Sequence, residues 1–399
     1  MRQAIHRPER AIATVLASAI ACAVIAAVML IVGHTPPAGA THSCSGVDIN
    51  PGDDLDAIVN NDPAETATTF CVHAPSSGAT YTIDHTVELG SGDKLLGQPG
   101  RVVTRGPTSY GVPLVKIRNG ASLPRLIDLS GSNVVLGWLD IAGANGRYIT
   151  PFPTDCPKPS ADGLRCPQNG TGLAIGAAKA DATLRMKYLR VHHNEVVGIG
   201  SMNGKLLHSN LHHNGTNPDF WGYAAAAVKG VDEYEAAYNY VHDNPANGLW
   251  CDECQDAGAA MPNGFWVHDN LLVNNGRWGV HYEHSPMGLA TGVHRSQPSA
   301  LIESNEIHGN GHNGAIYGGA SMSDAQNATF RNNFFGPKTI AGVSYAANSD
   351  KLATRFFDAG RADRTDLWNG DAVGNSLGGE AITNCGKPDK IVYCANNRN

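Results

Sequence analysis

The chain has 399 residues, a formal net charge of −7 and 42% hydrophobic residues, and only 16% of its residues are charged, against ~25% in an average protein. The hydrophobic content excludes a disordered chain, and 46 glycines without a strict period exclude both a collagen and a coiled coil. The acidic balance argues against nucleic acid as a partner, because phosphate binding needs a basic face. What remains is a globular protein that is rich in turns.

Residues 1–40 predict export. Three arginines within the first ten residues precede an uncharged run over residues 11–33, and Ala38-Gly39-Ala40 then provides the small residues typical of a signal-peptide cleavage site. The run is also long enough for a membrane-spanning helix, so a cleaved signal peptide and a retained signal anchor both fit. We therefore expect a secreted or cell-surface protein that is tethered if the segment stays attached.

The cysteines agree with export. Eight of the nine cysteines lie beyond the N-terminal segment, and an even number in an exported chain indicates disulfides, although it leaves their connectivity open. The simplest scheme pairs sequence neighbours: Cys44–Cys71, Cys156–Cys166, Cys251–Cys254 and Cys385–Cys394. A zinc site at the third pair would need a second CxxC motif, and the sequence has none, so a disulfide is favoured there.

An internal repeat predicts the fold. Its units read Asn-x4-Asn-x3-Gly and begin at Asn239, Asn270 and Asn305, with weaker copies around Asn194, Asn214 and Asn333. Each unit reads as a short strand, a turn and a short strand, and it must stack on its neighbours to bury its apolar face. We therefore predict an all-β, single-stranded right-handed parallel β-helix over residues 41–345. A β-propeller is the main alternative, but its blades need four strands in ~40–45 residues.

The two ends of the predicted β-helix differ from its middle. Asp53 or Asp54 is expected to cap a short helix that ends near Asn61 and covers the open end of the stack, which would otherwise expose unpaired strand edges. The first strands are expected at residues 68–72 and 81–83. Residues 346–399 lack the repeat and are predicted to form an irregular C-terminal cap or tail.

The order of these features resembles the pectate-lyase-like superfamily of right-handed parallel β-helix proteins. The likeness is carried by residues 51–55 and 97–100 and by the Asn/Gly units over residues 194–342, and it covers about three-quarters of the chain. Residues 241–252 and 274–283 further resemble a subfamily of exported bacterial β-helix repeat proteins, most of which have no assigned activity.

The resemblance implies a fold and no particular reaction. The active-site patterns of polygalacturonases and mannuronan epimerases are missing from the sequence, and so is a run of aspartates like the calcium site of pectate lyases. We therefore predict no cofactor, and calcium has no support in the sequence.

Aligning the repeat units on their glycines brings two acidic residues together. Asp252 and Glu283 each lie four residues after the glycine of their unit. Because parallel strands stack at about 4.8 Å, we expect the two carboxylates in register, with Lys229 on the equivalent strand one coil earlier. Like charges so close raise one pKa and leave a protonated acid beside an ionised base. In the later coils the same column is expected to hold Gly318 and Ala346.

Basic and aromatic residues cluster around this pair in the sequence, and together they make up a candidate carbohydrate site. The side chains expected to contact the sugar are Trp250, Trp278, Tyr282 and His284. The candidate catalytic residues are Asp252, Glu283, Lys229, His281 and Arg277.

The leading hypothesis is a lyase or epimerase that acts on a glycan containing uronic acids. Such chemistry removes the proton α to a carboxylate, and it needs a base and a group that offsets the charge of the substrate carboxylate. The candidate bases are Lys229, His281 and Tyr282. The candidate offsetting groups are Arg277 and a protonated Asp252 or Glu283.

Two alternatives remain open, so the sequence does not decide whether the protein is an enzyme. A glycoside hydrolase would use Asp252 as acid and Glu283 as base. A non-catalytic, cell-surface glycan-binding or adhesive protein would present the same face, with the acidic residues solvated or paired with Lys229 or Arg277. In each case the expected partner is a polysaccharide or cell-surface glycan, and the protein is expected to be a monomer.

Two sets of repeated polar residues have a structural interpretation. The asparagines at the turns tolerate left-handed backbone and can hydrogen-bond along a stack. Histidines recur at one repeat position, two residues before the turn asparagine. A repeated position more often reflects stacking than metal binding, so no metal site is predicted. These histidines are His192, His212, His242 and His308.

Overall fold

The computed structural model describes residues 44–62, 66–145, 172–177, 183–218, 224–252, 254, 264–283, 300–314, 317–323, 328–357, 369–383 and 391–399. All of them belong to the second of two compact units, His42–Asn399. The predicted export segment, residues 1–40, lies outside these ranges, as do Cys156, Cys166, His284 and Cys385. Among the residues that are described, no helix is long and apolar enough to cross a membrane.

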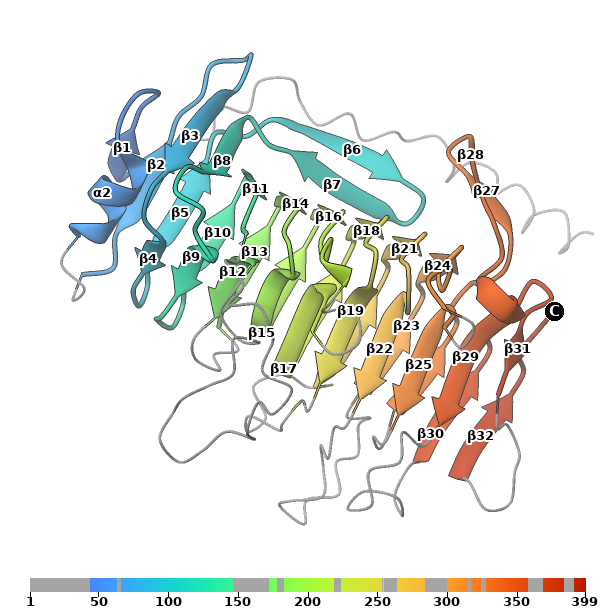
Figure 1. The fold of residues 1–399 in the computed structure, drawn as a ribbon. Helices are drawn as coiled ribbons and strands as arrows, with labels where there is room; N and C mark the ends of the chain where they lie inside the picture. Colours follow the sequence, from blue (N-terminus) through green and yellow to red (C-terminus); the bar gives the residue numbers. More distant parts are fainter. Residues whose placement is uncertain are drawn as a thin grey trace, which may run out of the picture. The chain divides into compact units, whose positions relative to one another are not determined.

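The described strands coil into three stacks of parallel strands (Figure 1), which we name A, B and C. Stack A contains β4 (Val87–Leu89), β9 (Arg125–Leu129), β12 (Leu173–Ala177), the first halves of β15 (Val197–Leu207) and β17 (Ala226–Ala237), β19 (Asn247–Asp252), β22 (Val280–Glu283), β25 (Ala320–Ser323), β29 (Leu352–Phe357) and β31 (Ala381–Ile382).

Stacks B and C complete each coil, and β15 and β17 run without a break from stack A into stack B. Stack B contains β1 (Val47–Ile49), β2 (Thr69–Val72), β5 (Lys94–Gly97), β10 (Val135–Gly137), β13 (Arg185–Lys187), the second halves of β15 and β17, β20 (Phe265–His268), β23 (Ala300–Glu303), β26 (Ala328–Arg331), β30 (Asn369–Val373) and β32 (Ile391–Ala395). Stack C contains β3 (Ala79–Ile83), β8 (Val115–Asn119), β11 (Leu139–Ala142), β14 (Arg190–His192), β16 (Asn210–His212), β18 (Tyr240–His242), β21 (Leu271–Val273) and β24 (Glu306–His308). The predicted right-handed parallel β-helix is confirmed.

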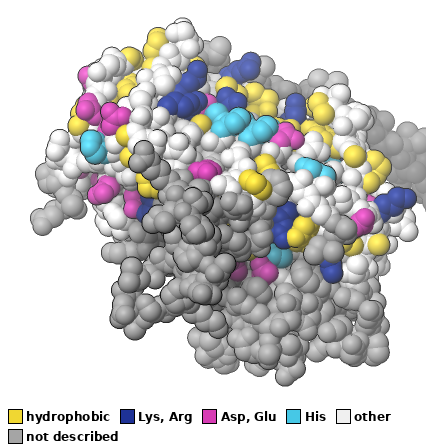
Figure 2. Space-filling model, in the orientation of Figure 1, with side chains coloured by type: hydrophobic (Ala, Val, Ile, Leu, Met, Phe, Trp, Pro, Cys, Tyr) yellow, Lys and Arg dark blue, Asp and Glu magenta, His cyan; other side chains and the backbone are white. Residues whose placement is uncertain are grey.

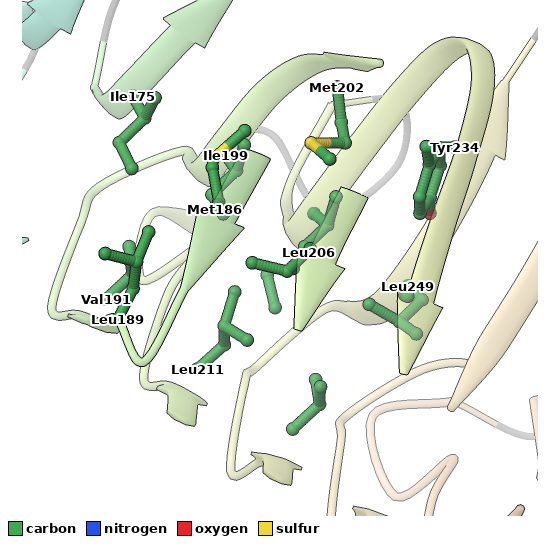
Figure 3. Close-up of a cluster of buried hydrophobic side chains, with 14 of the residues drawn as sticks. Ile175, Met186, Leu189, Val191, Ile199, Met202, Leu206, Leu211, Tyr234 and Leu249 are labelled. Carbon is green, nitrogen blue, oxygen red and sulfur yellow. The ribbon is translucent and has the colours of Figure 1, made fainter. Parts of the chain in front are cut away.

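The core lies inside the coils, because alternate residues of each strand point inward. In stack A, for example, Ile175, Ile199, Val228 and Leu249 pair in successive coils, and each is fully buried. Figure 3 shows three of these side chains beside the inward residues of neighbouring strands. This alternation leaves the intervening residues of every strand on the outer face, where a site can form.

Two ladders of buried asparagines join the coils at their turns. In each ladder the side-chain oxygen of one asparagine accepts hydrogen bonds from the backbone and side-chain amides of the asparagine one coil earlier, as Asn275 does from Asn244. The ladder between stacks C and A contains Asn194, Asn214, Asn244, Asn275, Asn310 and Asn348. The ladder between stacks B and C contains Asn239, Asn270, Asn305, Asn333, Asn375 and Asn397. The structural role predicted for the turn asparagines is confirmed.

The C-terminal region corrects the sequence prediction. The described residues between 346 and 399 do not form an irregular tail: β29, β30, β31 and β32 continue stacks A and B in parallel, and isolated bridges from Glu306 through Phe334 and Ser376 to Arg398 continue stack C. The repeat was missed because its spacing changes. After Asn333 a hairpin of β27 (Lys338–Ile340) and β28 (Val343–Tyr345) intervenes, so the second turn asparagine is Asn348 and not position 338.

A second hairpin, which the sequence did not predict, lies along stack C (Figure 1). It is formed by β6 (Arg101–Arg105) and β7 (Thr108–Val112). Its Tyr110 ring stacks on Tyr240 at 5.4 Å, and Arg105 donates hydrogen bonds to the hydroxyls of Tyr240 and Tyr345 at 2.8 and 3.2 Å. The hairpin therefore joins a segment near the first coils to strands far along the chain.

The N-terminal end is closed as predicted. Helix α2 (Leu55–Asn60) is capped by Asp54, whose carboxylate accepts a hydrogen bond from the backbone amide of Ala57 at 3.1 Å, and it buries Leu55 and Val59 in the core. A single 3-10 turn, η3 (Ser349–Lys351), is the other helical element in the described ranges.

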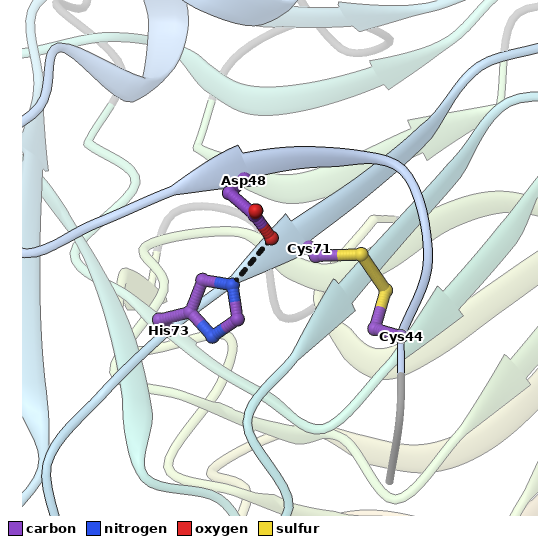
Figure 4. Close-up of a disulfide and its surroundings, with 4 residues drawn as sticks. All are labelled: Cys44, Asp48, Cys71 and His73. Atoms are coloured by element: carbon purple, nitrogen blue, oxygen red, sulfur yellow. Dashed lines mark hydrogen bonds and ion pairs between the residues drawn. A yellow bond between two sulfur atoms is a disulfide. The ribbon is translucent and has the colours of Figure 1, made fainter.

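Two predicted disulfides are present, Cys44–Cys71 and Cys251–Cys254, and Cys394 is also disulfide-bonded. The first joins the residue at position 44, just before β1, to β2, next to an ion pair between Asp48 and His73 at 2.7 Å (Figure 4).

Candidate functional site

The predicted acidic pair lies on the outer face of stack A. Asp252 in β19 and Glu283 in β22 are direct neighbours in the parallel register, as the sequence predicted. Lys229 lies one coil earlier, opposite Trp250. In the next coil the residue paired with Glu283 is Ser323, and not Gly318 as the sequence predicted.

The sequence placed Gly318 at this position because the third repeat unit is longer than the first two. In the third repeat unit the sequence holds five more residues between the turn asparagine, Asn310, and stack A than the second unit holds after Asn275, so Ala320 pairs with Val280. Counting from the glycine of the repeat therefore places this strand five residues too early. In the following coil, position 357 of β29 takes the place expected for Ala346.

Each carboxylate has a basic partner of its own. The Lys229 ammonium lies 2.9 Å from Asp252 Oδ2, and His281 Nε2 lies 3.0 Å from Glu283 Oε2. The other ring nitrogen of His281, Nδ1, hydrogen-bonds the hydroxyl of Ser321 in β25. The Lys229 ammonium also lies over the Trp250 ring, 4.2 Å from its centre. Two acid–base pairs therefore stand side by side on adjacent strands.

The exposed atoms of the site belong to three residues. The side chains of Lys229, Asp252 and Glu283 are 17%, 19% and 17% exposed, whereas that of His281 is only 6% exposed. A ligand on this face can therefore touch the ammonium and the two carboxylates directly. His281 is buried and does not contact the ligand, but it orients Glu283.

The aromatic residues have a different role from the one predicted. Tyr282 points into the core, is fully buried and lies 5.9 Å from the Phe265 ring, so it is neither a base nor a sugar contact. Trp250 and Trp278 are 3% and 2% exposed, and both pack against His281, with ring centres 5.6 and 6.0 Å from it. They fix the imidazole and offer no open platform for a sugar ring.

Arg277 is tied to a residue that the sequence analysis did not single out. Its guanidinium lies over the Tyr317 ring at 4.1 Å and donates a hydrogen bond to the Tyr317 hydroxyl. The Tyr317 ring in turn meets Trp278 edge-on at 5.7 Å. Tyr317, Ser321 and Ser323 were missed because the insertion that shifts the register also hides their place in the repeat.

Two polar groups at the site lack a hydrogen-bond partner among the described residues. Trp250 Nε1 and Ser323 Oγ are both buried, and neither makes a hydrogen bond there. Buried polar groups in proteins are nearly always satisfied, so such atoms need an explanation.

The outer face of stack C carries the predicted column of histidines. His192, His212 and His242 pair in successive coils, and their rings stack at 4.8 and 4.9 Å. Burial, together with the positive charge of neighbouring histidines and of Arg190, lowers the pKa of His212 to about 2. Figure 2 shows histidine side chains beside lysines and arginines on one face of the molecule.

No family model matches the sequence, and no curated protein matches it. Solved structures do match. They include tailspike protein 2 of an Escherichia coli O157:H7 bacteriophage (12% identity, TM-score 0.48, 83% of this chain and 38% of that chain). They also include the A-module of a mannuronan C-5 epimerase from Azotobacter vinelandii (13% identity, TM-score 0.45, 89% and 93%) and a pectate lyase (9% identity, TM-score 0.35, 83% and 70%).

The β-helix itself is established by the parallel register of the chain's own strands. The chain spans less than half the length of the tailspike.

Proposed function

We propose that the protein is an exported enzyme that acts on a polysaccharide containing uronic acids, at the outer face of stack A. The observation that carries the proposal is the register of Asp252 and Glu283 on adjacent strands, each with a basic group at about hydrogen-bond distance. The disulfides support export, because such bonds persist in oxidising compartments.

The shape of the face supports a polymeric substrate. The strands of stack A lie about 4.8 Å apart, so a chain that runs across them meets a new row of outward side chains at each step. Along this direction the partly exposed side chains of Lys229, Asp252 and Glu283 lie on three successive coils, in β17, β19 and β22. These side chains can contact successive units of one chain.

The charges favour proton abstraction over glycoside hydrolysis. The Lys229 ammonium favours the ionised form of Asp252, and a His281 that donates its Nε2 proton to Glu283 favours the ionised form of Glu283. A hydrolase needs one of its two carboxyl groups protonated to donate to the leaving oxygen. A lyase or an epimerase instead needs a base and a cation that offsets the substrate carboxylate.

The residues then take the following roles. Glu283, oriented by His281, accepts the proton from the carbon α to the substrate carboxylate, and the electron pair of that C–H bond moves onto the carboxylate. Lys229, held by Asp252, stabilises the negative charge that develops there. The intermediate then either expels the β-oxygen substituent, which takes a proton from solvent water, or takes a proton from solvent water on the other face. The first outcome is elimination, and the second is epimerisation.

The test is activity on a panel of acidic polysaccharides. Elimination gives new ultraviolet absorbance from an unsaturated uronate, and epimerisation changes the sugar's NMR couplings. Glu283→Gln is expected to reduce kcat by about 10²–10⁴-fold, the usual contribution of a general base. The matched control is Glu303→Gln in stack B, which removes an outward glutamate that is likewise paired with a basic side chain, Arg331, at 2.7 Å.

The remaining outcomes each overturn the proposal. New reducing ends without unsaturated or epimerised product point to a hydrolase. Binding of a glycan that survives Glu283→Gln and Asp252→Asn, with no turnover, points to a non-catalytic glycan-binding protein. Equal loss of activity in Glu283→Gln and Glu303→Gln shows a general structural effect and removes Glu283 from the chemistry.

A further inference from the structure

Four histidines meet on the outer face of stack C, away from the acidic pair. His192 and His193 lie at the end of β14, and His212 and His213 lie at the end of β16, with His192 and His212 directly opposite in the register. The rings of His192 and His212 stack at 4.8 Å, and those of His193 and His213 stack at 4.9 Å. The four imidazoles thus form two facing pairs in adjacent coils.

The ring nitrogens of each pair point at one another. His192 Nδ1 lies 2.7 Å from His193 Nδ1, and His212 Nδ1 lies 2.9 Å from His213 Nδ1. One nitrogen from each of His192, His193 and His212 lies within 4.8 Å of the others. Nitrogen lone pairs that converge in this way are the donor set of a metal site.

The fold itself does not require histidine at these positions. In the next coil the same two positions hold His242 and Asp243, and in the coil after that they hold Val273 and Asn274. Asp243 and Asn274 have the same left-handed backbone, with φ of 52° and 55°, as His193 and His213, with φ of 53° each. Stacking and turn formation are therefore satisfied without imidazoles, and the facing pairs occur in just two coils of the described part of stack C.

A buried carboxylate supports His192 from behind. His192 Nε2 lies 2.9 Å from Asp140 Oδ1, and Asp140 is 1% exposed and paired with Arg118 at 2.6 Å. A neutral His192 that donates its Nε2 proton to this carboxylate keeps the lone pair on Nδ1, toward His193. Metal-binding histidines almost always donate their second ring nitrogen to a carboxylate, carbonyl or water in this way.

We propose that His192, His193, His212 and His213 bind one divalent transition-metal ion of borderline character, of the Zn²⁺ type. Imidazole nitrogens suit Zn²⁺, Ni²⁺ and Cu²⁺, and Zn–N bonds of about 2.0–2.1 Å in a tetrahedral site place the nitrogens about 3.4 Å apart. The Nδ1 atoms are 2.7 and 2.9 Å apart within the two pairs, and one ring nitrogen from each of His192, His193 and His212 lies within 4.8 Å of the others, so small ring movements reach that value. His193 and His213 are exposed, so their rings can rotate to close the site.

One contact must change when the metal binds. Arg190 Nε donates to His212 Nε2 at 3.2 Å, which places the proton of a neutral His212 on Nδ1. Binding through Nδ1 moves that proton to Nε2 and releases the arginine. Arg190 already lies 3.3 Å from Asp140 Oδ2, so a carboxylate is at hand to keep it paired.

The experiment uses the full chain, purified without a polyhistidine tag and stripped of metal with a chelator. Titration with Co²⁺ is expected to give the visible absorption bands of a tetrahedral nitrogen site at one equivalent, and Zn²⁺ is expected to displace them. The double variant His193→Gln/His213→Gln changes exposed side chains only. Loss of a carboxylate that only hydrogen-bonds a metal ligand weakens metal binding by roughly 10–100-fold. Because the double variant removes two ligands, it should weaken Zn²⁺ binding by more than that.

The matched control is His312→Gln, which removes an exposed histidine outside the cluster and should leave binding unchanged. Zn²⁺ should also raise the unfolding temperature of the wild-type protein and of His312→Gln, but not that of the double variant, because the metal links two coils. The proposal is overturned if the wild-type protein binds no stoichiometric metal. It is also overturned if the double variant binds as tightly as the control.

Discussion

The asparagine ladders and the outer face of stack A use polar side chains in opposite ways. In the ladders the same residue type recurs coil after coil, fully buried, with each amide bonded to the next. On the outer face the residue changes at every coil, from lysine to tryptophan, histidine, serine and arginine. Repetition therefore marks the groups that hold the coils together, and departure from the repeat marks the groups available for chemistry.

Breaking a ladder should have the largest effect on stability. In Asn275→Ala the amides of Asn244 lose their acceptor, and Val241 O and Asn310 Oδ1 each lose a donor. All three asparagines are fully buried. Each buried group left unsatisfied costs about 1–3 kcal/mol, so the free energy of unfolding should fall by about 3 kcal/mol or more. Urea denaturation measures this.

The control for that prediction is Asn217→Ala, which removes an amide outside the ladders that bonds Glu195 and is half-buried. Its effect should stay below about 1 kcal/mol, as for most partly exposed sites. Similar losses in the two variants would show that the ladders are no more important than any other asparagine.

A charged cluster in stack B tests whether departure from the repeat always means function. Glu235 is paired with Lys205 and, at 3.5 Å, with His268. Burial alone would lower the pKa of His268, but the carboxylates of Glu235 and Asp269 outweigh it and raise the pKa. Burial would raise the pKa of Glu235, but His268 and Lys205 outweigh it and lower the pKa. We interpret this cluster as structural.

The prediction follows from the signs of these shifts. The raised pKa of His268 adds stability that is complete below its unfolded value of 6.5 and is lost as the pH rises through the folded value. The lowered pKa of Glu235 adds stability above 4.5, which is lost at lower pH. His268→Gln should therefore destabilise by about 1–2 kcal/mol between these two values and by less at higher pH, in urea titrations at several pH values. A pH-independent difference would contradict the assignment.

Removing a pair from the candidate site should have the smallest effect on stability. The double variant Lys229→Met/Asp252→Asn removes both members of the ion pair. Its free energy of unfolding should change by less than about 1 kcal/mol, while activity on the polysaccharide falls. A loss of several kcal/mol with activity retained would reverse the comparison and make the pair structural.

The sequence was informative wherever the repeat was regular. The spacing of Asn and Gly predicted the coil, the turn ladders and the register of Asp252 with Glu283, because each depends on a position that recurs. Strand alternation alone would have excluded Tyr282, since it lies between two outward residues, His281 and Glu283, and so faces the core.

The rest depended on insertions, which no repeat describes. The five additional residues between Asn310 and stack A moved Ser321 and Ser323 into the site, and the hairpin of β27 and β28 hid the coils that follow it. The burial of Trp250 was not predictable either, because it depends on which side chains of neighbouring coils surround the ring, and these lie far apart in the sequence.

The hairpin of β6 and β7 has a consequence for how the protein folds. In a stack of coils with contacts between neighbours only, unfolding can start at one end and proceed coil by coil. Arg105 contacts residues 135 and 240 positions further along the chain, so the hairpin bridges coils that are not neighbours. Separation of the intervening coils requires these contacts to break first. We therefore expect the middle of the protein to melt as one cooperative block, while its two ends fray independently.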